Sequence, residues 1–290
     1  MKNSRVLFRE IIARISLREN PEEIQTMVYL LLEHFLSLSR TDIMSGKVIE
    51  YAGPVSVQLQ NAIERINLGE PIQYVIGYEY FFGRKFHVNQ SVLIPRPETE
   101  ELVRLVLSHA RTLTAGDDVR PLKILDIGTG SGCIAITLSA ELRNAEIFGT
   151  DVSNAALSVA SGNANALNAR VTFVEHDILR EVLPFDNLDI VVSNPPYVTS
   201  AEKASMQPNV LDFEPHTALF VPSDDPLLFY EKIAEDVRKT LTRNGFVAVE
   251  VNENFADQVS TLFRQNGFAS VLVTKDISGK DRIVSGSFGP

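Results

Sequence analysis

From residue 122 onward, strand-like and helix-like segments alternate along this chain, and that alternation limits the folds open to it. Runs rich in β-branched residues predict strands at 122–127, 146–151, 171–175, 188–193, 246–251, 270–274 and 282–288. The segments between them predict helices at 133–142, 153–167, 226–241 and 253–265. This pattern predicts an α/β protein with a parallel sheet covered by helices on both faces. Ligands of such sheets bind at the carboxyl ends of the strands, so the loops after the first four strands are expected around one crevice.

The first part of the chain has a different pattern, which predicts a separate helical domain. Apolar residues recur at helical spacing over 1–76, and another helix is predicted at 55–68. The run Asn20-Pro21-Glu22-Glu23 combines a cap, a proline and first-turn acids, which favour a helix start. Lys and Arg balance Asp and Glu over residues 1–90, ten against ten, so the net charge of −10 lies in residues 91–290. This shift predicts a boundary within 77–95.

The boundary segment itself indicates a β-hairpin, because residues 78–93 alternate aromatic and polar side chains around Gly83 and Asn89. The predicted organisation is therefore a helical domain at 1–76, a β-hairpin linker at 77–95 and an α/β domain at 96–290. Residues 94–100 are expected to open a helix. Proline and acidic residues are favoured in the first turn of any helix, so their presence here needs no functional explanation. A polar loop is predicted at 114–118.

Composition limits the partners and the compartment. A net charge of −10 argues against a broad basic face that tracks nucleic-acid phosphates, so no direct contact with nucleic acid is expected. The single cysteine rules out an internal disulfide and fits a reducing compartment. The apolar runs fall short of a membrane span, and the N-terminus does not resemble a secretion signal. We therefore expect a cytoplasmic protein without a membrane partner.

No metal site is predicted. The histidines are scattered, and none has a second metal ligand at a recognised spacing. Each is expected to be a surface residue or a satisfied core residue. They are His34, His87, His109, His176 and His216.

The tetrapeptide Asn194-Pro195-Pro196-Tyr197 directly follows the predicted strand at 188–193. Two prolines make the loop stiff and leave the Pro195 carbonyl with no helix to join. The amide oxygen of Asn194 supplies a second acceptor. Two acceptors on a stiff loop can bind both hydrogens of one planar –NH2 group, with the Tyr197 ring packed on it. A plain turn is the alternative for this tetrapeptide taken alone.

A glycine-rich loop follows the first predicted strand and opens the first helix, with the sequence Asp126-Ile127-Gly128-Thr129-Gly130-Ser131-Gly132. Glycines allow a tight turn and the close approach of a ligand to the backbone. The dinucleotide fingerprint needs glycine at position 133, where this chain has Cys133. The spacing thus disfavours a pyrophosphate, and with it an NAD-dependent oxidoreductase, and leaves room for another nucleoside cofactor.

Two aspartates extend this interpretation. Asp151 lies at the end of the second predicted strand, where its carboxylate can accept both hydroxyls of a ribose. A helix cap is the alternative role, although Ser153 is well suited to that task. Asp177 follows the third strand and could accept a hydrogen bond from an exocyclic amine, with Ile178 packed on a purine. Alone, Asp177 would be an ordinary loop residue.

Together these features resemble the class I methyltransferases that use S-adenosylmethionine. Within that class, the tetrapeptide at 194–197 matches the motif of enzymes that methylate a planar amino or amide nitrogen. Residues 93–100 and the run Phe213-Glu214-Pro215 are similar to segments of one family, the peptide chain release factor glutamine methyltransferases (HemK/PrmC). The resemblance implies a Rossmann-like domain with a seven-stranded, mostly parallel sheet, preceded by a small all-helical domain and a β-hairpin linker.

The resemblance also implies an activity, namely methylation of the glutamine side-chain nitrogen in the Gly-Gly-Gln loop of bacterial release factors. It implies that residues 194–197 hold the glutamine, with Asn194, Pro195 and Tyr197 catalytic. One departure from the family is the run 221–225, where a glycine pair is common. The residues implied to hold the cofactor are Gly128, Thr129, Gly130, Ser131, Gly132, Asp151, Asp177, Ile178 and Asn194.

Two other functions remain as alternatives. A nucleic-acid amino methyltransferase could use the same tetrapeptide on adenine or guanine, but such enzymes usually carry a basic face or a recognition domain. A non-catalytic module could bind the cofactor or a partner through its helices. Against the module, we note that a binding relic has no use for both Asn194 and Asp151.

Overall fold

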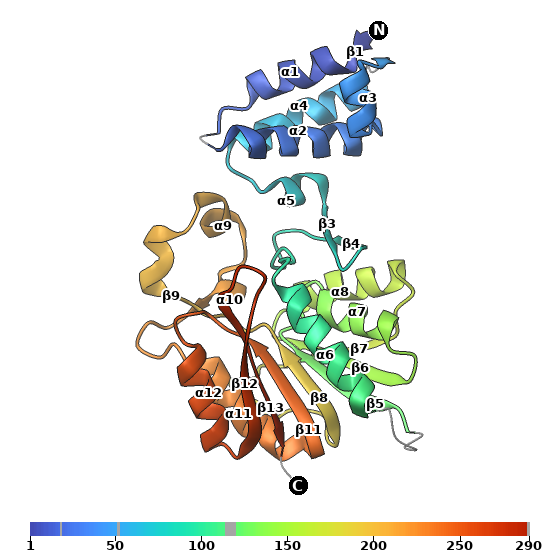
Figure 1. Cartoon of the computed structure of the whole chain (residues 1–290). Helices are drawn as coiled ribbons and strands as arrows, with labels where there is room; N and C mark the ends of the chain where they lie inside the picture. The colour runs from blue at the N-terminus through green and yellow to red at the C-terminus, as the bar shows by residue number, and fades with distance from the viewer. Residues whose placement is uncertain (18, 51–52, 114–119, 289–290) are drawn as a thin grey trace. The chain divides into compact units, whose positions relative to one another are not determined.

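The computed structural model describes residues 1–17, 19–50, 53–113 and 120–288 (Figure 1). The chain forms two compact units. The first comprises Met1–Tyr78 and Gln207–Phe213, and the second comprises Glu79–Met206 and Glu214–Pro290. The polar loop predicted at 114–118 lies outside the described residues.

The first unit is built mainly from helices, and those within residues 4–76 share one apolar core. The side chain of Asn20 accepts a hydrogen bond from the Glu22 N–H at 3.0 Å, so the second helix begins where the sequence predicts. The core includes Ile11, Val28 and Ile63, each almost completely buried. A pair of two-residue antiparallel strands, which the all-helical prediction did not include, is also present. The elements are β1 (Lys2–Asn3), α1 (Ser4–Arg14), α2 (Pro21–Leu36), α3 (Arg40–Ser45), β2 (Val48–Ile49), α4 (Pro54–Asn67), α5 (Ile72–Ile76) and α9 (Pro208–Phe213).

The second unit contains a seven-stranded sheet in the order β12-β13-β11-β8-β5-β6-β7. The pairs from β11 to β7 are parallel, and β13 runs antiparallel to both of its neighbours. This confirms the predicted α/β fold with a mostly parallel sheet. The strands are β5 (Leu122–Ile127), β6 (Ala145–Asp151), β7 (Val171–Glu175), β8 (Leu188–Ser193), β11 (Leu241–Glu250), β12 (Phe268–Lys275) and β13 (Asp281–Phe288).

Helices cover both faces of this sheet (Figure 1). Successive residues of a strand point to opposite faces. Ile124 therefore packs in one cluster with α6 (Thr99–Leu113), α7 (Cys133–Glu141) and α8 (Asn154–Ala166). Leu125 packs in the other cluster with α11 (Leu228–Thr240) and α12 (Ala256–Gln265). Two separate cores thus hold the central strands in place.

The strand order reverses at β5. The chain passes from β5 through α7 to β6 on one side, and later returns to place β8 on the other side. Ile127 and Ser193 are partners in the β5–β8 register, so both strands end at the same level. The loops that begin at Gly128 and Asn194 consequently diverge from one point. Ligands of doubly wound sheets bind at such a point.

Shorter elements surround this end of the sheet. The predicted hairpin is present as β3 (Tyr78–Phe81) and β4 (Arg84–His87), with positive φ at Phe82 and Gly83 in its turn. After residue 197 come β9 (Val198–Thr199), a 3-10 helix (Ser200–Ser205), α10 (His216–Leu219) and β10 (Phe220–Val221). β9 and β10 pair in parallel, which brings segment 216–221 beside the tetrapeptide. Among the described helices, none combines the length and apolar character needed to cross a membrane.

Candidate functional site

A cavity of about 410 Å³ lies over the carboxyl ends of the central strands. The four loops that the sequence places around one crevice all contribute to its wall, through Gly128 after β5, Asp151 at the end of β6, Asp177 after β7 and Asn194 after β8. Its volume falls in the range of small-molecule sites, about 300–1,000 Å³. The second unit therefore contains a cavity large enough for a nucleoside-sized ligand.

The glycine loop presents bare backbone to this cavity. Gly128 and Gly130 line the wall, and both have positive φ, at 72° and 54°. No described atom lies within 4 Å of the position that a Cβ would take at either residue. The N–H groups of Gly128 and Thr129 both donate to the Thr150 carbonyl at 2.8 Å, which ties the loop to β6. A ligand can thus approach the backbone of this loop closely.

Three predicted members of the same loop are not in the cavity wall and lie beneath it. Thr129 and Ser131 are buried, and the Thr129 hydroxyl donates to Asp126 Oδ2 at 2.7 Å. The Ser131 carbonyl accepts from Asn163 Nδ2 at 2.9 Å. Gly132 has a φ of 80° and begins α7 as its N-cap. These residues hold the shape of the loop in the structure.

The residues at the two ends of the loop are buried. Cys133, which occupies the position of the third fingerprint glycine, packs in the core, and burial raises the pKa of its thiol to about 12. Burial also raises the pKa of Asp126 to about 7, although hydrogen bonds from Thr129 and Ala135 oppose this shift. The Oδ1 atom of Asp126 has no hydrogen-bond partner among the described residues. The sequence interpretation gave no role to this aspartate, although a charged residue in an apolar strand is a recognisable signal.

Asp151 closes the glycine loop and does not cap the following helix. Its Oδ2 accepts from the Gly130 N–H and its Oδ1 from the Ser153 N–H, each at 2.9 Å. The cap of α8 is Ser153, whose hydroxyl accepts from the Ala156 N–H at 3.2 Å. Burial raises the pKa of Asp151 despite these hydrogen bonds. A carboxylate has about four acceptor sites, so Asp151 retains acceptor capacity for a ligand hydroxyl.

The loop after β7 contributes an acidic and an apolar residue to the wall. Asp177 Oδ1 accepts from the Leu179 N–H at 3.0 Å, and its Oδ2 lies 3.4 Å from Arg180 Nε. Ile178 is buried and also lines the cavity. His176, which the sequence did not single out as a site residue, lines the wall as well. Its Nδ1 is buried without a hydrogen-bond partner among the described residues.

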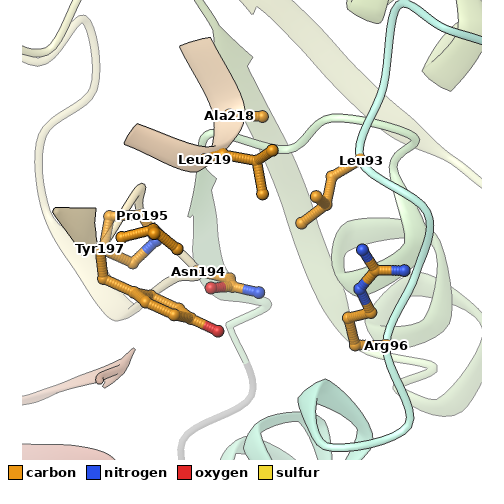
Figure 2. A pocket seen from close by; sticks show the side chains of 8 residues that line it. Leu93, Arg96, Asn194, Pro195, Tyr197, Ala218 and Leu219 are labelled. Atoms are coloured by element: carbon orange, nitrogen blue, oxygen red, sulfur yellow. The ribbon is translucent and has the colours of Figure 1, made fainter. Parts of the chain in front are cut away.

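A smaller pocket of about 50 Å³ adjoins the tetrapeptide (Figure 2). In Figure 2 the Asn194 side chain lies between Tyr197 and Arg96, with Leu93 and Leu219 across the opening. Asn194 and Pro195 line both the small pocket and the large cavity, whereas Pro196 lines only the cavity and Tyr197 only the pocket. The first two residues of the tetrapeptide therefore form the partition between the two spaces.

A salt bridge holds two walls of the small pocket together. Glu214, whose side chain is 1% exposed, pairs with Arg96 at 2.5 Å between Nη2 and Oε1. The other oxygen of Glu214 accepts from the Ile94 N–H at 3.2 Å. Leu93 and Arg96 on one wall are thereby joined to the segment that carries Ala218 and Leu219. The sequence singled out residues 93–100 and Glu214 only by resemblance, and the structure brings Glu214 against residues 94 and 96.

Two polar residues behind the tetrapeptide were not predicted from the sequence. The Asn194 Nδ2 donates to Thr99 Oγ1 at 3.2 Å, and the Thr99 hydroxyl donates to Glu250 Oε2 at 2.7 Å. The Tyr197 hydroxyl donates to Glu250 Oε1 at 3.1 Å. Burial and the nearby charge of Glu250 raise the pKa of Tyr197, so its phenol stays protonated. The available signal for Glu250 was an acid inside the apolar run 246–251.

The run 221–225, where the sequence departs from the family it resembles, borders both the cavity and the tetrapeptide segment. Pro222 lines the large cavity, and Val221 pairs with Thr199 in the β9–β10 ladder. The Ser223 hydroxyl accepts from the Ala201 N–H at 3.1 Å. Within the described ranges, no group of three or more His, Cys, Asp or Glu side chains could hold a metal ion.

Two family models match this chain. Residues 8–77 match the PrmC N-terminal domain, and residues 105–211 match the methyltransferase small domain. The two matches cover most of the helical unit and the strands β5 to β8 with the tetrapeptide.

Close relatives extend over almost the whole chain. A release factor glutamine methyltransferase from Flavobacterium psychrophilum is 40% identical over 288 residues, which is 99% of each chain. The protein of the same name from Bacteroides thetaiotaomicron is 43% identical, over 91% of this chain and 93% of its own. The one from Bacillus subtilis is 37% identical over 88% of each chain.

Solved structures share the fold at low sequence identity. The hMettl16 catalytic domain, solved in complex with the MAT2A 3'UTR hairpin 6, matches with a TM-score of 0.55 and 18% identity over 85% of each chain. A methyltransferase from Pyrococcus furiosus matches with a TM-score of 0.50 and 16% identity, over 80% of this chain and 100% of its own. These likenesses show a methyltransferase-type α/β fold.

Proposed function

This chain belongs to the release factor glutamine methyltransferase family, and from that membership we propose its reaction. It transfers a methyl group from S-adenosylmethionine to the side-chain amide nitrogen of a release-factor glutamine, the one in the Gly-Gly-Gln loop. One observation carries the proposal at the level of the site. Asn194 and Pro195 line both a cofactor-sized cavity and a small pocket beside it. Two hydrogen-bond acceptors, the Asn194 amide oxygen and the Pro195 carbonyl, would therefore lie where the methyl donor and the planar glutamine amide can meet.

The large cavity fits the cofactor. Bare backbone at Gly128 and Gly130 leaves space that a Cβ would fill, and Asp151 retains acceptor capacity for a ribose hydroxyl. Asp177 and Ile178 would hold the adenine end of the cavity, and Asn194 would border the methyl end. Thr129, Ser131 and Gly132 would act from beneath by holding the loop. S-adenosylmethionine supplies a methyl group on a positively charged sulfur.

The small pocket would hold the glutamine amide. The lone pair of an amide nitrogen is delocalised into the carbonyl, so the nitrogen is a poor nucleophile. The Asn194 Oδ1 and the Pro195 carbonyl would accept one N–H each, which returns electron density to nitrogen and aims its lone pair. These acceptors bind more strongly as positive charge grows on nitrogen, and they are oriented before the reaction. The C–N bond would form as the bond between the methyl carbon and the cofactor sulfur breaks, which leaves a neutral thioether as the second product. One N–H proton would then pass from the methylated nitrogen to solvent, so no strong base is needed.

The rest of the pocket is suited to the apolar stem of a glutamine side chain. Leu93, Val198 and Leu219 line it together with the tetrapeptide. Their contacts with the two methylene groups would exclude water from the amide. The Arg96–Glu214 pair keeps these walls at a fixed spacing, because Glu214 is buried and bound to both Arg96 and the Ile94 backbone.

We also propose a separate role for each of the three segments of the chain. The helical domain at 1–76 would recognise the release factor, the hairpin at 77–95 would link, and residues 96–290 would carry the chemistry. The partner would be a release factor in the cytoplasm, with no direct contact to nucleic acid or membrane.

Transfer of a radiolabelled methyl group tests this function. The acceptors are a purified bacterial release factor, the same factor with its Gly-Gly-Gln glutamine replaced by alanine, and bulk DNA and RNA. We expect label on the first acceptor alone. Label on nucleic acid but not on the release factor would overturn the proposal in favour of a nucleic-acid amino methyltransferase. Label on none of the acceptors would favour a binding module.

A further inference from the structure

Four side chains form a continuous hydrogen-bonded chain behind the small pocket, in the order Asn194, Thr99, Glu250, Tyr197. Sheet register brings them together. β8 and β11 are parallel neighbours in which Ser193 pairs with Val249, so the residues that follow each lie at the same edge. Thr99 comes from the first turn of α6. Residues distant in the sequence thus meet under the tetrapeptide.

The direction of these hydrogen bonds determines how the Asn194 amide is turned. A threonine hydroxyl has one hydrogen, and Thr99 gives it to Glu250 Oε2 at 2.7 Å. The Thr99 oxygen can therefore only accept from residue 194. An amide donates through its nitrogen alone, so Nδ2 must face Thr99, at 3.2 Å. The Oδ1 atom is directed away from Thr99 and has no hydrogen-bond partner among the described residues.

We propose that Thr99 and Glu250 are positioning residues that hold the Asn194 amide with its oxygen toward the substrate –NH2. This inference rests on the proposed function. The two ends of an asparagine amide are nearly equal in size but opposite in hydrogen bonding. A flipped amide would present N–H groups to the N–H groups of the glutamine and lose the contact that aims its nitrogen. The Glu250–Thr99 pair excludes the flipped amide.

Glu250 is suited to this task in its ionised form, because an ionised carboxylate only accepts hydrogen bonds. Burial raises the pKa of Glu250, while the hydrogen bond from Thr99, the positive charge of Arg282 and the hydrogen bond from Tyr197 oppose that shift and favour the ionised form. Glu250 is 1% exposed, and it receives hydrogen bonds from both Thr99 and Tyr197. A buried charge is costly unless it is paired or hydrogen-bonded. A fold that needed only packing at this position would be served by an apolar residue, as at the neighbouring Val249 and Val251, both fully buried. The positioning role therefore explains why a carboxylate occupies position 250.

A matched pair of variants at position 99 tests the proposal. Thr99→Val keeps the shape and removes the hydroxyl, whereas Thr99→Ser keeps the hydroxyl. In Thr99→Val the Nδ2 atom would face a methyl group, which favours the flipped amide. We expect kcat for release-factor methylation to fall by about tenfold to a hundredfold, because an unsatisfied buried donor costs about 1–3 kcal/mol. KM for the release factor and Kd for S-adenosylmethionine should change by less than about threefold. Thr99→Ser should restore most of kcat.

Equal kcat for Thr99→Val and the wild-type enzyme would overturn the proposal, and so would an equal loss in both variants. The wild-type enzyme separates this failure from a failure of the proposed function. If the wild-type enzyme methylates the release factor and Thr99→Val does so equally well, only the positioning role is wrong. If the wild-type enzyme methylates no release factor, the function itself is wrong.

Glu250→Gln tests the next member of the same hydrogen-bonded series and does not depend on the folding of Thr99→Val. A carboxamide can donate to Thr99, so the hydroxyl is no longer forced to accept from Asn194. We expect a loss of kcat similar to that of Thr99→Val. The double variant should lose little beyond the worse single variant, because both act through one hydrogen-bonded chain. Losses that multiply would show two independent roles and contradict the proposal.

Discussion

The hydroxyl of Ser193 donates a 2.7 Å hydrogen bond to the carbonyl oxygen of Ile127, and this contact ties together the carboxyl ends of the two central strands. The glycine loop leaves from one side of it and the tetrapeptide from the other. The spacing between the cofactor cavity and the small pocket depends on how firmly these two ends are held.

Ser193→Ala should lower the free energy of unfolding by about 1 kcal/mol, the usual net value of one buried hydrogen bond. Ser193 is fully buried, so no water replaces the lost donor readily. Urea unfolding at neutral pH measures the change. Ser158→Ala is the matched control, because the Ser158 hydroxyl is exposed and bonds only within its own helix, to the Asn154 carbonyl. Equal losses in the two variants would contradict this account of Ser193.

Gly132 and Gly162 should respond to alanine in opposite directions. Gly132 has a φ of 80°, and its added Cβ would lie 2.8 Å from Ile136 Cδ1 and 3.2 Å from Ala160 Cβ. We expect Gly132→Ala to destabilise the fold by about 1–3 kcal/mol. Gly162 lies on the exposed side of α8 with no described atom within 4 Å of the added Cβ, so Gly162→Ala should stabilise by up to about 1 kcal/mol. Thermal unfolding of both variants checks the signs.

Asp189 should make the free energy of unfolding depend on pH in the acidic range. It is buried at the start of β8 and accepts two bonds from Arg120, at 2.6 and 2.7 Å, one from the Lys123 N–H and one from Thr242. Burial alone would raise the pKa of Asp189, but these hydrogen bonds outweigh it and the pKa is lowered. A lowered folded-state pKa adds stability above the unfolded pKa of about 3.9, and this is lost as pH falls through the folded value.

Asp189→Asn should therefore lower the free energy of unfolding by about 2 kcal/mol at pH 7, because a buried charged acceptor is removed. The difference from the wild-type protein should shrink below about pH 4 as the carboxylate protonates in both states. Urea titrations at pH 7, 5 and 3.5 follow this. A difference that stays constant over that range would show that the carboxylate charge is not the cause.

The strands β5, β7 and β8 could be predicted to the residue, and the other strands of the sheet only approximately. β5, β7 and β8 begin and end where their apolar runs do, because glycine, proline or polar loops bound them. β11 begins at Leu241, earlier than the predicted 246, since its polar start is joined through a register shift. We could not predict the two-residue strands or the short helices α9 and α10, because they are too short to show a repeating pattern of apolar residues. Sequence patterns of period two or 3.6 need more residues than these elements contain.

The parts of the candidate site that lie in continuous motifs were visible in the sequence, and the parts that depend on strand order were not. The glycine loop and the tetrapeptide are local runs. Thr99 and Glu250 are 151 positions apart and meet because α6 packs against β11. Glu214 likewise reaches Arg96 from 118 positions away. A single sequence contains no record of such pairings, so these residues could be singled out by resemblance or by unusual charge alone.

Asn194→Ala removes the amide oxygen that, together with the Pro195 carbonyl, would bind the two hydrogens of the glutamine –NH2. Calorimetric titration with S-adenosylmethionine and a methyl-transfer assay on the release factor are run on the same preparation. We expect turnover to be abolished while cofactor affinity stays within about threefold, because the side chain acts on the glutamine amide in the transition state. Turnover close to that of the wild-type enzyme, or an equal loss of cofactor binding and turnover, would contradict this role of Asn194.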